Sequence, residues 1–398
     1  MRDRAALLLP VYLPTMLLAF GQGMLVPALP LYAGTFVDSF SLISLVVTAA
    51  GIGTLVADVP AGAMLARIGR KRAMIIGTMG IAVATAAMGA ASQFPELIVY
   101  RLVFGVGSAL WNISRMAYLT DVTTLAERGR ALSAFGGVSR IGTFVGPAVG
   151  GIVAAQWGLA MPFFVAAAIA LAAAIIAIRT VEEGESRFPG GGRHLPWSTL
   201  ARTARNHSRE LITAGSAQIF VQMIRAGRQL IVPLYGANVL GLDVAQVGAI
   251  VSISAAIDML LFIPAGVVMD RMGRKWATVP SFAIMAVGMA LIPLAADFTT
   301  LALATGLIGL GNGMSSGTMM TLGADLAPRD AIGEFMGVWR LVGDAGSTGG
   351  PFIVGAIADA AGLGVAALTL AGVGVVASLT LAVFVRETLR PPLRPGIA

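Results

Sequence analysis

Ionisable side chains inside long apolar stretches are the residues of this sequence that could do chemistry. Arg101 and Asp258 each lie well inside a run of mostly apolar residues, and Arg225 and Arg228 share another such run. A charge in hydrocarbon costs about 2.5–3.5 kcal/mol or more, so a residue of this kind is a functional candidate. Ion binding and proton transfer are therefore the chemistries to consider first.

Asp258 is the carboxylate nearest to the middle of its apolar stretch. Arg225 and Arg228 are three residues apart, so in a helix they share one face, and we predict that Asp258 is their counter-ion. Two interpretations stay open: a static buried pair, or a carboxylate whose proton exchange releases arginine and switches the site. Arg101 has no acidic neighbour in sequence. It either takes part in coupling or substrate binding, or satisfies carbonyl groups of a Gly- and Pro-rich helix.

Two further carboxylates lie in apolar stretches. Asp58 and Arg115 lie toward the same ends of their helices, which predicts a structural ion pair between them. Asp344 lies four residues after Arg340, so these two can satisfy each other, or Arg340 can reach the basic cluster after Asp58. The set predicted to couple protons is Arg101, Asp258, Asp58 and Asp344.

The composition places most of the chain in lipid. Of 398 residues, 57% are hydrophobic and 12% are charged, and the mean hydropathy is +0.85. A water-soluble fold cannot hide that much apolar surface. The chain has no cysteine, and its two histidines, His194 and His207, lie in one polar segment. We therefore expect no metal site and no cofactor, and the lack of a G-x-x-x-x-G-K-[ST] loop excludes nucleotide hydrolysis.

Polar residues divide the chain into twelve apolar segments. A membrane span needs about 20 such residues. The predicted helices are residues 10–34, 42–65, 73–92, 96–119, 131–155, 161–179, 210–236, 245–269, 276–295, 299–322, 333–358 and 364–386.

The chain contains an internal duplication. The sequence from Pro60 to Lys71 returns from Pro264 to Lys275, 204 residues later. Two membrane halves with a binding site between them are a transporter plan. We predict an all-α membrane protein of twelve transmembrane helices in two pseudo-symmetric six-helix bundles. The predicted domains are a bundle at 1–179, a linker with an amphipathic helix at 180–209, a bundle at 210–386 and a tail at 387–398.

Basic residues outside the spans all lie on one side of the predicted membrane. That side also holds both termini, because the number of spans is even, while the other side holds acids such as Asp38, Asp243, Asp297 and Asp359. Lys and Arg accumulate on the cytoplasmic side, so we predict cytoplasmic termini in a bacterial inner membrane. The net charge of +7 then reflects topology, and no nucleic-acid partner is expected.

Four stretches carry distinctive motifs. Residues 62–71 are close to G-x-L-a-D-R-x-G-R-K, and residues 101–109 fit R-x-x-x-G-x-G-x-A. Residues 146–151 fit G-P-x-x-G-G, and residues 21–30 fit G-x5-P-x-x-P. In these motifs the sequence resembles the major facilitator superfamily, within it the twelve-helix drug:proton antiporter branch. The resemblance implies a secondary transporter rather than an enzyme.

The resemblance also implies a gate at the cytoplasmic helix ends. In the family, acids after helices 4 and 10 pair with arginines of the repeated motif when that side is shut. The gating residues expected here are Gly62, Arg67, Gly69, Arg70, Asp121, Gly266, Asp270, Arg274, Asp325 and Arg340. The first motif has Ala66 where the family has an acid, whereas the second keeps Asp270. We therefore predict an asymmetric gate with its stronger lock in the second half.

The G-P-x-x-G-G stretch is similar to a motif of antiporters. Glycines let helices approach closely and proline bends a helix. We predict a tight interface between the halves, which prevents leak, at Gly142, Gly146, Pro147, Gly150 and Gly151.

The predicted function is proton-coupled efflux of a small amphipathic or drug-like compound by alternating access. A proton-coupled carrier of an anionic substrate, such as an organic acid or acidic lipid, is the alternative within transport. A channel or a non-transporting scaffold is the alternative from another class. Expected partners are the small-molecule substrate, protons and the lipid bilayer, and the chain is expected to be a monomer. The cavity is predicted to be lined by Gln22, Arg101, Trp111, Asn112, Gln222, Arg225, Arg228, Asn312 and Ser315.

Overall fold

Apolar stretches become long helices in this fold, because a backbone in lipid must satisfy its hydrogen bonds within each span. A computed structural model describes residues 7–123, 125–181, 197–328 and 331–389. The first half contains η1 (Leu8–Tyr12), α2 (Leu13–Ala33), α3 (Phe40–Ile68), α4 (Arg70–Gly89), α5 (Phe94–Val122), α6 (Leu125–Trp157) and α7 (Met161–Thr180). The second half contains α9 (Ser208–Asn238), α10 (Val244–Arg271), α11 (Arg274–Leu291), η2 (Ile292–Leu294), α12 (Phe298–Met314), α13 (Thr318–Leu326), α14 (Ile332–Ala361) and α15 (Leu363–Val383).

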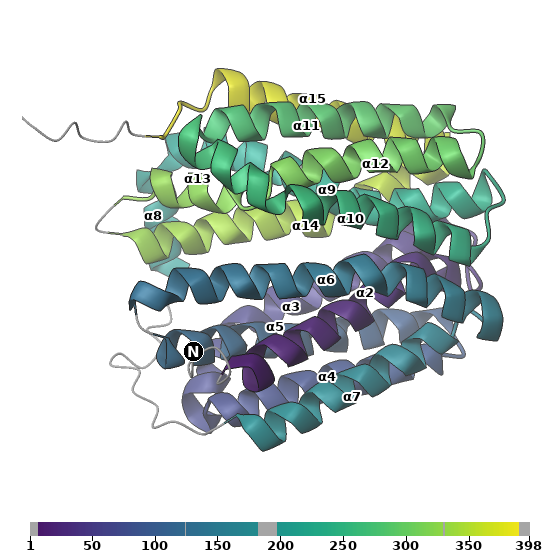
Figure 1. Cartoon of the computed structure of the whole chain (residues 1–398), viewed down its shortest axis with the longest axis horizontal. Coiled ribbons are helices and arrows are strands. Elements are labelled where there is room, and N and C mark those ends of the chain that lie inside the picture. The colour runs from purple at the N-terminus through teal and green to yellow at the C-terminus, as the bar shows by residue number, and fades with distance from the viewer. Residues whose placement is uncertain (1–6, 124, 182–196, 329–330, 390–398) are drawn as a thin grey trace, which may run out of the picture.

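These helices form two bundles of six spans, in which α12 and α13 together make one broken span (Figure 1). Helices α2–α7 make up the first bundle and α9–α15 the second. Within the described residues, nine helices are long and apolar enough to cross a membrane by themselves. The other spans are α9 and α14, which carry several charged residues, and the broken α12–α13. The predicted fold class is confirmed.

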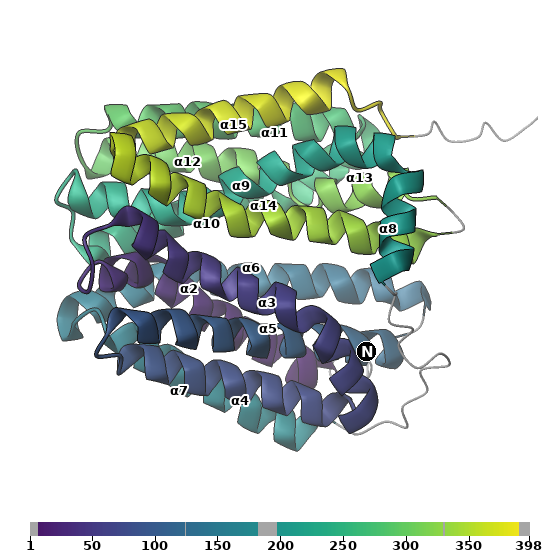
Figure 2. The same cartoon turned by 180° about the vertical axis from the view of Figure 1, so that it is seen from behind.

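The two ends of the bundles differ in charge. The end with Arg67–Arg72 and Arg271–Lys275 is called the basic end, and it lies on the left in Figure 1 and on the right in Figure 2. The opposite end, with Asp38, Asp243 and Asp297, is called the acidic end.

The two repeated basic phrases are mostly helical. The sequence predicts a polar loop at 66–72, but α3 continues to Ile68 and α4 begins at Arg70. Only Gly69 separates them, with a φ of 82° that glycine adopts without a steric penalty. Gly273 makes the equivalent turn between α10 and α11. The basic side chains are therefore fixed on helix ends rather than on a loop.

The predicted helix 299–322 is wrong as a single helix. It breaks after Met314, and α13 begins at Thr318. Gly317 between them has a φ of 75°, a left-handed conformation that a continuous α-helix cannot contain. The break leaves backbone carbonyl groups near the middle of the span without helical partners.

Part of the predicted linker is helical. Helix α8 (Trp197–Asn206) lies at the basic end and contacts α14 (Figure 2). Residues 182–196 of the linker and 390–398 of the predicted tail lie outside the described residues. The predicted domain boundaries stay predictions.

The bundles meet along two main lines of contact, which we call seams. Helix α3 packs against α14, and α6 packs against α10, while α2 contacts α9 between them. Both seams join antiparallel helices, and they occupy equivalent positions in the duplicated halves. Figure 2 shows α3 and α14 side by side.

Candidate functional site

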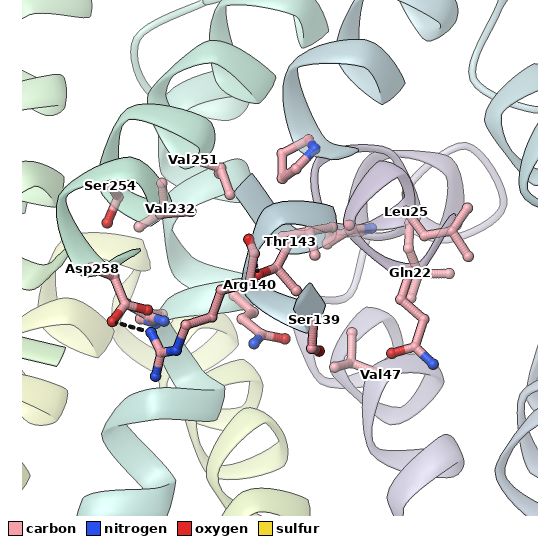
Figure 3. A pocket seen from close by; sticks show the side chains of 18 of the residues that line it. Gln22, Leu25, Val47, Ser139, Arg140, Thr143, Val232, Val251, Ser254 and Asp258 are labelled. Carbon is pink, nitrogen blue, oxygen red and sulfur yellow. Dashed lines mark hydrogen bonds and ion pairs between the residues drawn. The ribbon is translucent and has the colours of Figure 1, made fainter. Parts of the chain in front are cut away.

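Two adjoining cavities lie between the bundles, with volumes of about 570 Å³ and about 510 Å³. Both are lined by Val47, Arg101, Arg140, Arg228 and Gln229, so they form one region, which we call the central cavity. Figure 3 shows the first of them. The charged lining consists of four arginines and a single aspartate. In the described part of the chain, no cluster of His, Cys, Asp or Glu side chains gathers that could hold a metal ion.

Six of the nine residues predicted to line the cavity do line it: Gln22, Arg101, Gln222, Arg225, Arg228 and Asn312. Whether they bind a substrate stays a prediction. The structure places the other three elsewhere. Trp111 is 3% exposed beside the guanidinium of Arg115, and Asn112 accepts a hydrogen bond from Arg115 at 2.9 Å. Ser315 is fully buried at the helix break.

Asp258 on α10 pairs with Arg140 on α6, and not with Arg225 or Arg228 as the sequence suggests. Arg140 Nη1 donates to Asp258 Oδ1 at 2.7 Å across the two bundles (Figure 3). The other carboxylate oxygen accepts from Asn312 Nδ2 at 2.9 Å. We call Arg140 and Asp258 the central ion pair. Arg225 and Arg228 do lie on one helix at the predicted spacing. The carboxylate of Asp258, however, is bound by Arg140 of the other bundle.

Arg225 supports the broken span. Its Nη2 donates to the Ser315 carbonyl oxygen at 3.1 Å and to the Ser315 hydroxyl at 2.7 Å. Arginine offers several donors in a fixed plane, which suits a carbonyl freed by a helix break. Arg140 adds a hydrogen bond to the hydroxyl of Ser316. The break between α12 and α13 is therefore held by arginines from both bundles.

Arg101 and Arg228 have few partners. Arg101 Nε donates to the Val46 carbonyl oxygen at 3.2 Å, and its guanidinium lies 4.9 Å from the Phe104 ring centre. Arg228 forms no hydrogen bond or ion pair with any residue that the structure describes. Both side chains face the central cavity.

The α6–α10 seam is tight from the acidic end to the central ion pair. A Cβ built on Gly151 would lie 3.2 Å from Gly248 Cα. Further along, Ser252 Oγ donates to the Phe144 carbonyl oxygen at 2.7 Å. Beyond the ion pair, a Cβ built on Gly136 would lie 3.9 Å from Phe262 of α10, and one built on Gly137 would meet no atom within 4 Å. The helices therefore pack less closely from the ion pair toward the basic end.

Asp359 joins the bundles at the acidic end. This residue of α14 accepts hydrogen bonds from the N–H groups of Phe40 at 2.6 Å and Ser41 at 2.9 Å, at the start of α3. It also accepts from the Ser39 hydroxyl at 2.7 Å. A carboxylate at a helix N-terminus is a favourable cap, here supplied by the opposite bundle. Both seams are thus closed at the acidic end.

Asp58 on α3 pairs with Arg340 on α14, and not with Arg115 as predicted. Arg340 Nη2 lies 3.5 Å from Asp58 Oδ2, and Arg340 Nε lies 3.6 Å from Asp344 Oδ2. Arg115 instead stacks on the ring of Phe135 of α6, with its guanidinium 4.2 Å from the ring centre. The Arg340 side chain is 56% exposed, so this contact holds the basic end weakly.

Both ion pairs implied by the family resemblance are present at the basic end. Arg70 pairs with Asp121, and Arg274 Nε lies 2.9 Å from Asp325 Oδ2. Asp270 lies 3.6 Å from Arg274 Nη1, whereas the first half has no acid at that position. Each pair lies within one bundle, so these pairs alone do not join the halves. Their function in gating stays a prediction.

Three other residues of the repeated motif, Gly62, Gly266 and Arg67, form neither close packing contacts nor ion pairs with the described residues. A Cβ built on Gly62 or Gly266 would meet nothing within 4 Å. Arg67 is exposed and forms no ion pair with any described residue. At these positions the motif therefore makes no close contact with the opposite bundle in this conformation.

Glu387 adds a cap to the second motif. Its carboxylate accepts from the N–H groups of Arg274 at 2.9 Å and Lys275 at 3.0 Å, at the start of α11. Burial raises the pKa of the Glu387 carboxyl, but the N–H groups of Leu389, Lys275, Arg274 and Thr388 outweigh it and lower that pKa below its ordinary value. The contacts around Arg274 are thus more numerous than the sequence motif alone indicates.

The glycine motif of α6 packs mostly within its own bundle, which corrects the prediction of an interface between the halves. Three of its members face α2: Gly142, Gly146 and Gly150. A Cβ built on Gly146 would lie 2.5 Å from the Phe20 carbonyl oxygen. Gly151 and the Pro147 carbonyl do face α10 of the second bundle. The motif therefore mainly sets the close approach of α6 and α2.

Arg140 and Asp359 are the main residues that sequence reasoning missed as site residues. Arg140 is the only charged residue between positions 134 and 157, and that isolation was a usable signal. Asp359 gave none, because it lies among other acids at the same end.

The family model described as Major Facilitator Superfamily matches residues 11–243 and 216–397. An uncharacterized MFS-type transporter of Methanocaldococcus jannaschii is 24% identical over 356 residues, which cover 89% of this chain and 91% of that protein. Multidrug resistance protein 2 of Bacillus subtilis is 27% identical over 274 residues, which cover 67% of each chain.

Among solved structures, the nucleoside transporter NupG superposes with a TM-score of 0.79 at 14% identity. The match covers 96% of this chain and 100% of that chain. At this identity the likeness shows a shared fold.

Proposed function

We propose that this chain, which belongs to the major facilitator superfamily, exports a small amphipathic compound in exchange for protons by alternating access. Membership makes it a multi-pass membrane transporter of a small molecule and not an enzyme. Proton exchange and the direction of transport are our proposal. The observation that carries it is the central ion pair, which links the bundles beside the cavity.

The central ion pair is proposed to lock the empty transporter. While Asp258 is ionised it holds Arg140, and the α6–α10 seam stays closed at the acidic end. Protonation of Asp258 removes the charge that holds Arg140, because a neutral carboxyl is a much weaker partner for guanidinium. A substrate that binds Arg140 in place of Asp258 would break the same ion pair. The transporter can then change conformation only when it has bound either a proton or a substrate. This requirement is what makes proton–substrate exchange obligatory.

Asp58 and Asp344 are proposed as secondary proton sites. They share Arg340 on the α3–α14 seam, so two carboxylates compete for one guanidinium. Like charges close together disfavour joint ionisation. Protonation there would loosen the inter-bundle contact nearest to the basic end.

We place the basic end in the cytoplasm of a bacterium, with both termini on that side of the inner membrane, on the basis of the positive-inside rule. The conformation described here is then closed to the outside and weakly held toward the cytoplasm. A monomer is proposed as the working unit, since one chain supplies both seams and the whole cavity.

The substrate is proposed to be amphipathic because apolar side chains cover much of the cavity wall, among them Leu25, Val232 and Val251. A relative named as a multidrug resistance protein supports a drug-like compound. An anionic substrate is the second candidate, since the charged lining is mostly arginine.

Proton flux in proteoliposomes tests the proposal. Vesicles loaded with a pH-sensitive dye would receive naphthoate, naphthylmethanol or naphthylmethylammonium, which share one apolar body. At least one probe should move protons through the wild type, and Asp258→Asn should abolish this. Arg179→Gln, an exposed arginine of α7 outside the cavity, is the matched control. Proton movement that survives Asp258→Asn would contradict the proposal.

A further inference from the structure

We propose that the central cavity binds a carboxylate carried by an apolar body, and that Arg228 and Arg101 are the residues that bind it. This inference rests on the proposed function for the claim that the cavity is the transport site. It adds the chemical class of the substrate and the residues that recognise it.

Two of the four cavity arginines already have partners. Arg140 is neutralised by Asp258 at 2.7 Å. Arg225 is held by the carbonyl and hydroxyl of Ser315 at the helix break. No carboxylate remains in the lining for the other two arginines.

Arg228 is the cation without a partner. No hydrogen bond or ion pair reaches it from the described residues, although it lines both parts of the cavity. Arg101 enters the same space, and the contacts found for it are the Val46 carbonyl, through Nε, and the Phe104 ring. Neither contact neutralises its charge. The two guanidinium groups therefore present unused N–H donors to one region.

Uncompensated guanidinium groups between transmembrane bundles favour an anion. A buried charge is stable only when it is paired or hydrogen-bonded. Guanidinium binds carboxylate through parallel N–H donors, which gives both strength and orientation. A cationic substrate would instead meet an excess of positive charge. The same electrostatics would also attract an anion that enters from the weakly held basic end.

The rest of the wall fits an apolar body. Leu25 and Leu29 of α2 face the cavity from one bundle, and Val232, Val251 and Ile308 face it from the other. In Figure 3, Leu25 and the two valines surround the space beside Arg140. An apolar wall with a few convergent polar groups is typical of sites that orient an amphipathic ligand. The carboxylate would lie at the arginines and the apolar body along this wall.

Binding to the full chain in nanodiscs of neutral phosphatidylcholine tests the inference. Calorimetry would compare naphthoate with naphthylmethanol and naphthylmethylammonium, which share the naphthyl group and carry an anionic, a neutral and a cationic head group. Laurate would show whether a flexible lipid chain replaces the ring. We expect naphthoate or laurate to bind, and naphthylmethylammonium to bind at least about tenfold more weakly.

Variants assign the binding to the arginine. Arg228→Gln should weaken acid binding about tenfold or more, the loss expected for one charge-assisted hydrogen bond. Arg228→Lys keeps the charge but loses the parallel donors, so it should bind the acid more weakly than the wild type and more tightly than Arg228→Gln. Arg179→Gln should retain all of the affinity. Equal or tighter binding of the ammonium probe would overturn the inference. So would unchanged acid binding in Arg228→Gln, or failure of both acids to bind.

The proton-flux assay separates this inference from the proposed function. If an acid binds but no probe moves protons, the exchange mechanism fails and the binding site stands. If only the ammonium probe moves protons, the exchange mechanism stands and the anionic class is wrong.

Discussion

Arg140 on α6 and Asp258 on α10 form an ion pair that links the two bundles beside the central cavity. From this pair to the acidic end the two helices pack backbone to backbone, and toward the basic end they pack less closely. The position equivalent to Arg140 in the second half, 204 residues later, is Asp344, which has the opposite charge. The duplicated seams thus share a backbone arrangement but carry different ion pairs. The two seams therefore hold different ionisable groups.

The central ion pair should couple energetically across the bundles. Asp258→Asn and Arg140→Gln should each lower the free energy of unfolding, because each leaves a partly buried group without its partner. The double variant should be less destabilised than the sum of the two, by about 1–3 kcal/mol. Denaturant unfolding of the three variants measures this. Additive effects would show that the pair contributes nothing.

Removal of the Asp359 cap should open the acidic end. In a Ser44→Cys background, Asp359→Ala should raise labelling by a membrane-impermeant maleimide about threefold to thirtyfold, the range expected for a lost cap. Ser44 is fully buried in the α3–α14 seam, and the chain has no native cysteine.

The control for this cap is Asp297→Ala. Asp297 caps α12 of its own bundle through the Thr300 N–H at 2.8 Å and does not bridge the halves. It should leave the labelling rate of Ser44→Cys nearly unchanged. If both variants labelled equally fast, Asp359 would act as an ordinary helix cap.

Gly146 should tolerate no side chain. In Gly146→Ala the added methyl group would lie 2.5 Å from the Phe20 carbonyl oxygen and close to other α2 backbone atoms, which cannot rotate away. We expect a loss of about 1–3 kcal/mol in unfolding free energy, typical of overpacking. Gly349→Ala on α14, where a Cβ meets nothing within 4 Å, should not be destabilised. A similar loss in both variants would argue against close packing as the cause.

Glu387 should make the free energy of unfolding depend on pH in the acidic pH range. Its folded pKa is depressed, so its contribution is present above the unfolded pKa and is lost as pH falls through the folded value. Near neutral pH, Glu387→Gln should therefore be less stable than the wild type, by at most about 1 kcal/mol, because solvent screens the charge of this exposed side chain. Thermal unfolding from about pH 7 to pH 3 should show the difference shrinking below about pH 4.5. A constant difference would mean that the charge is not involved.

The sequence predicted the helices well, because each span must be about 20 apolar residues long whatever its neighbours are. It failed where tertiary contacts decide. Gly317 breaks the predicted helix 299–322, and the break is stabilised because Arg225 binds the freed carbonyl of Ser315. The glycines of α6 were recognised as packing residues, but which helix they face depends on the rotation of α6 in its bundle.

The candidate site was predicted in composition but not in pairing. Residues on eight different helices meet at the cavity. In the sequence, an intramembrane charge shows that a partner is needed but not which residue supplies it. Asp258 was assigned to two intramembrane arginines of the preceding helix, whereas its partner Arg140 lies 118 residues away on the other bundle. Asp58 was assigned to Arg115 because both lie toward the same ends of their helices, but its partner Arg340 also lies on the other bundle.

The most direct test of the central claim is the distance between the bundles at the acidic end as a function of pH. Spin labels at Gln93→Cys and Ala296→Cys, one exposed position on each bundle, would report it by double electron–electron resonance in nanodiscs. When the pH is lowered from about 8 to about 5, the wild type should gain a longer-distance population. Asp258→Asn should hold that population at every pH. A wild-type distance distribution that does not change with pH would contradict the account. So would an Asp258→Asn variant whose distances change with pH as those of the wild type are expected to.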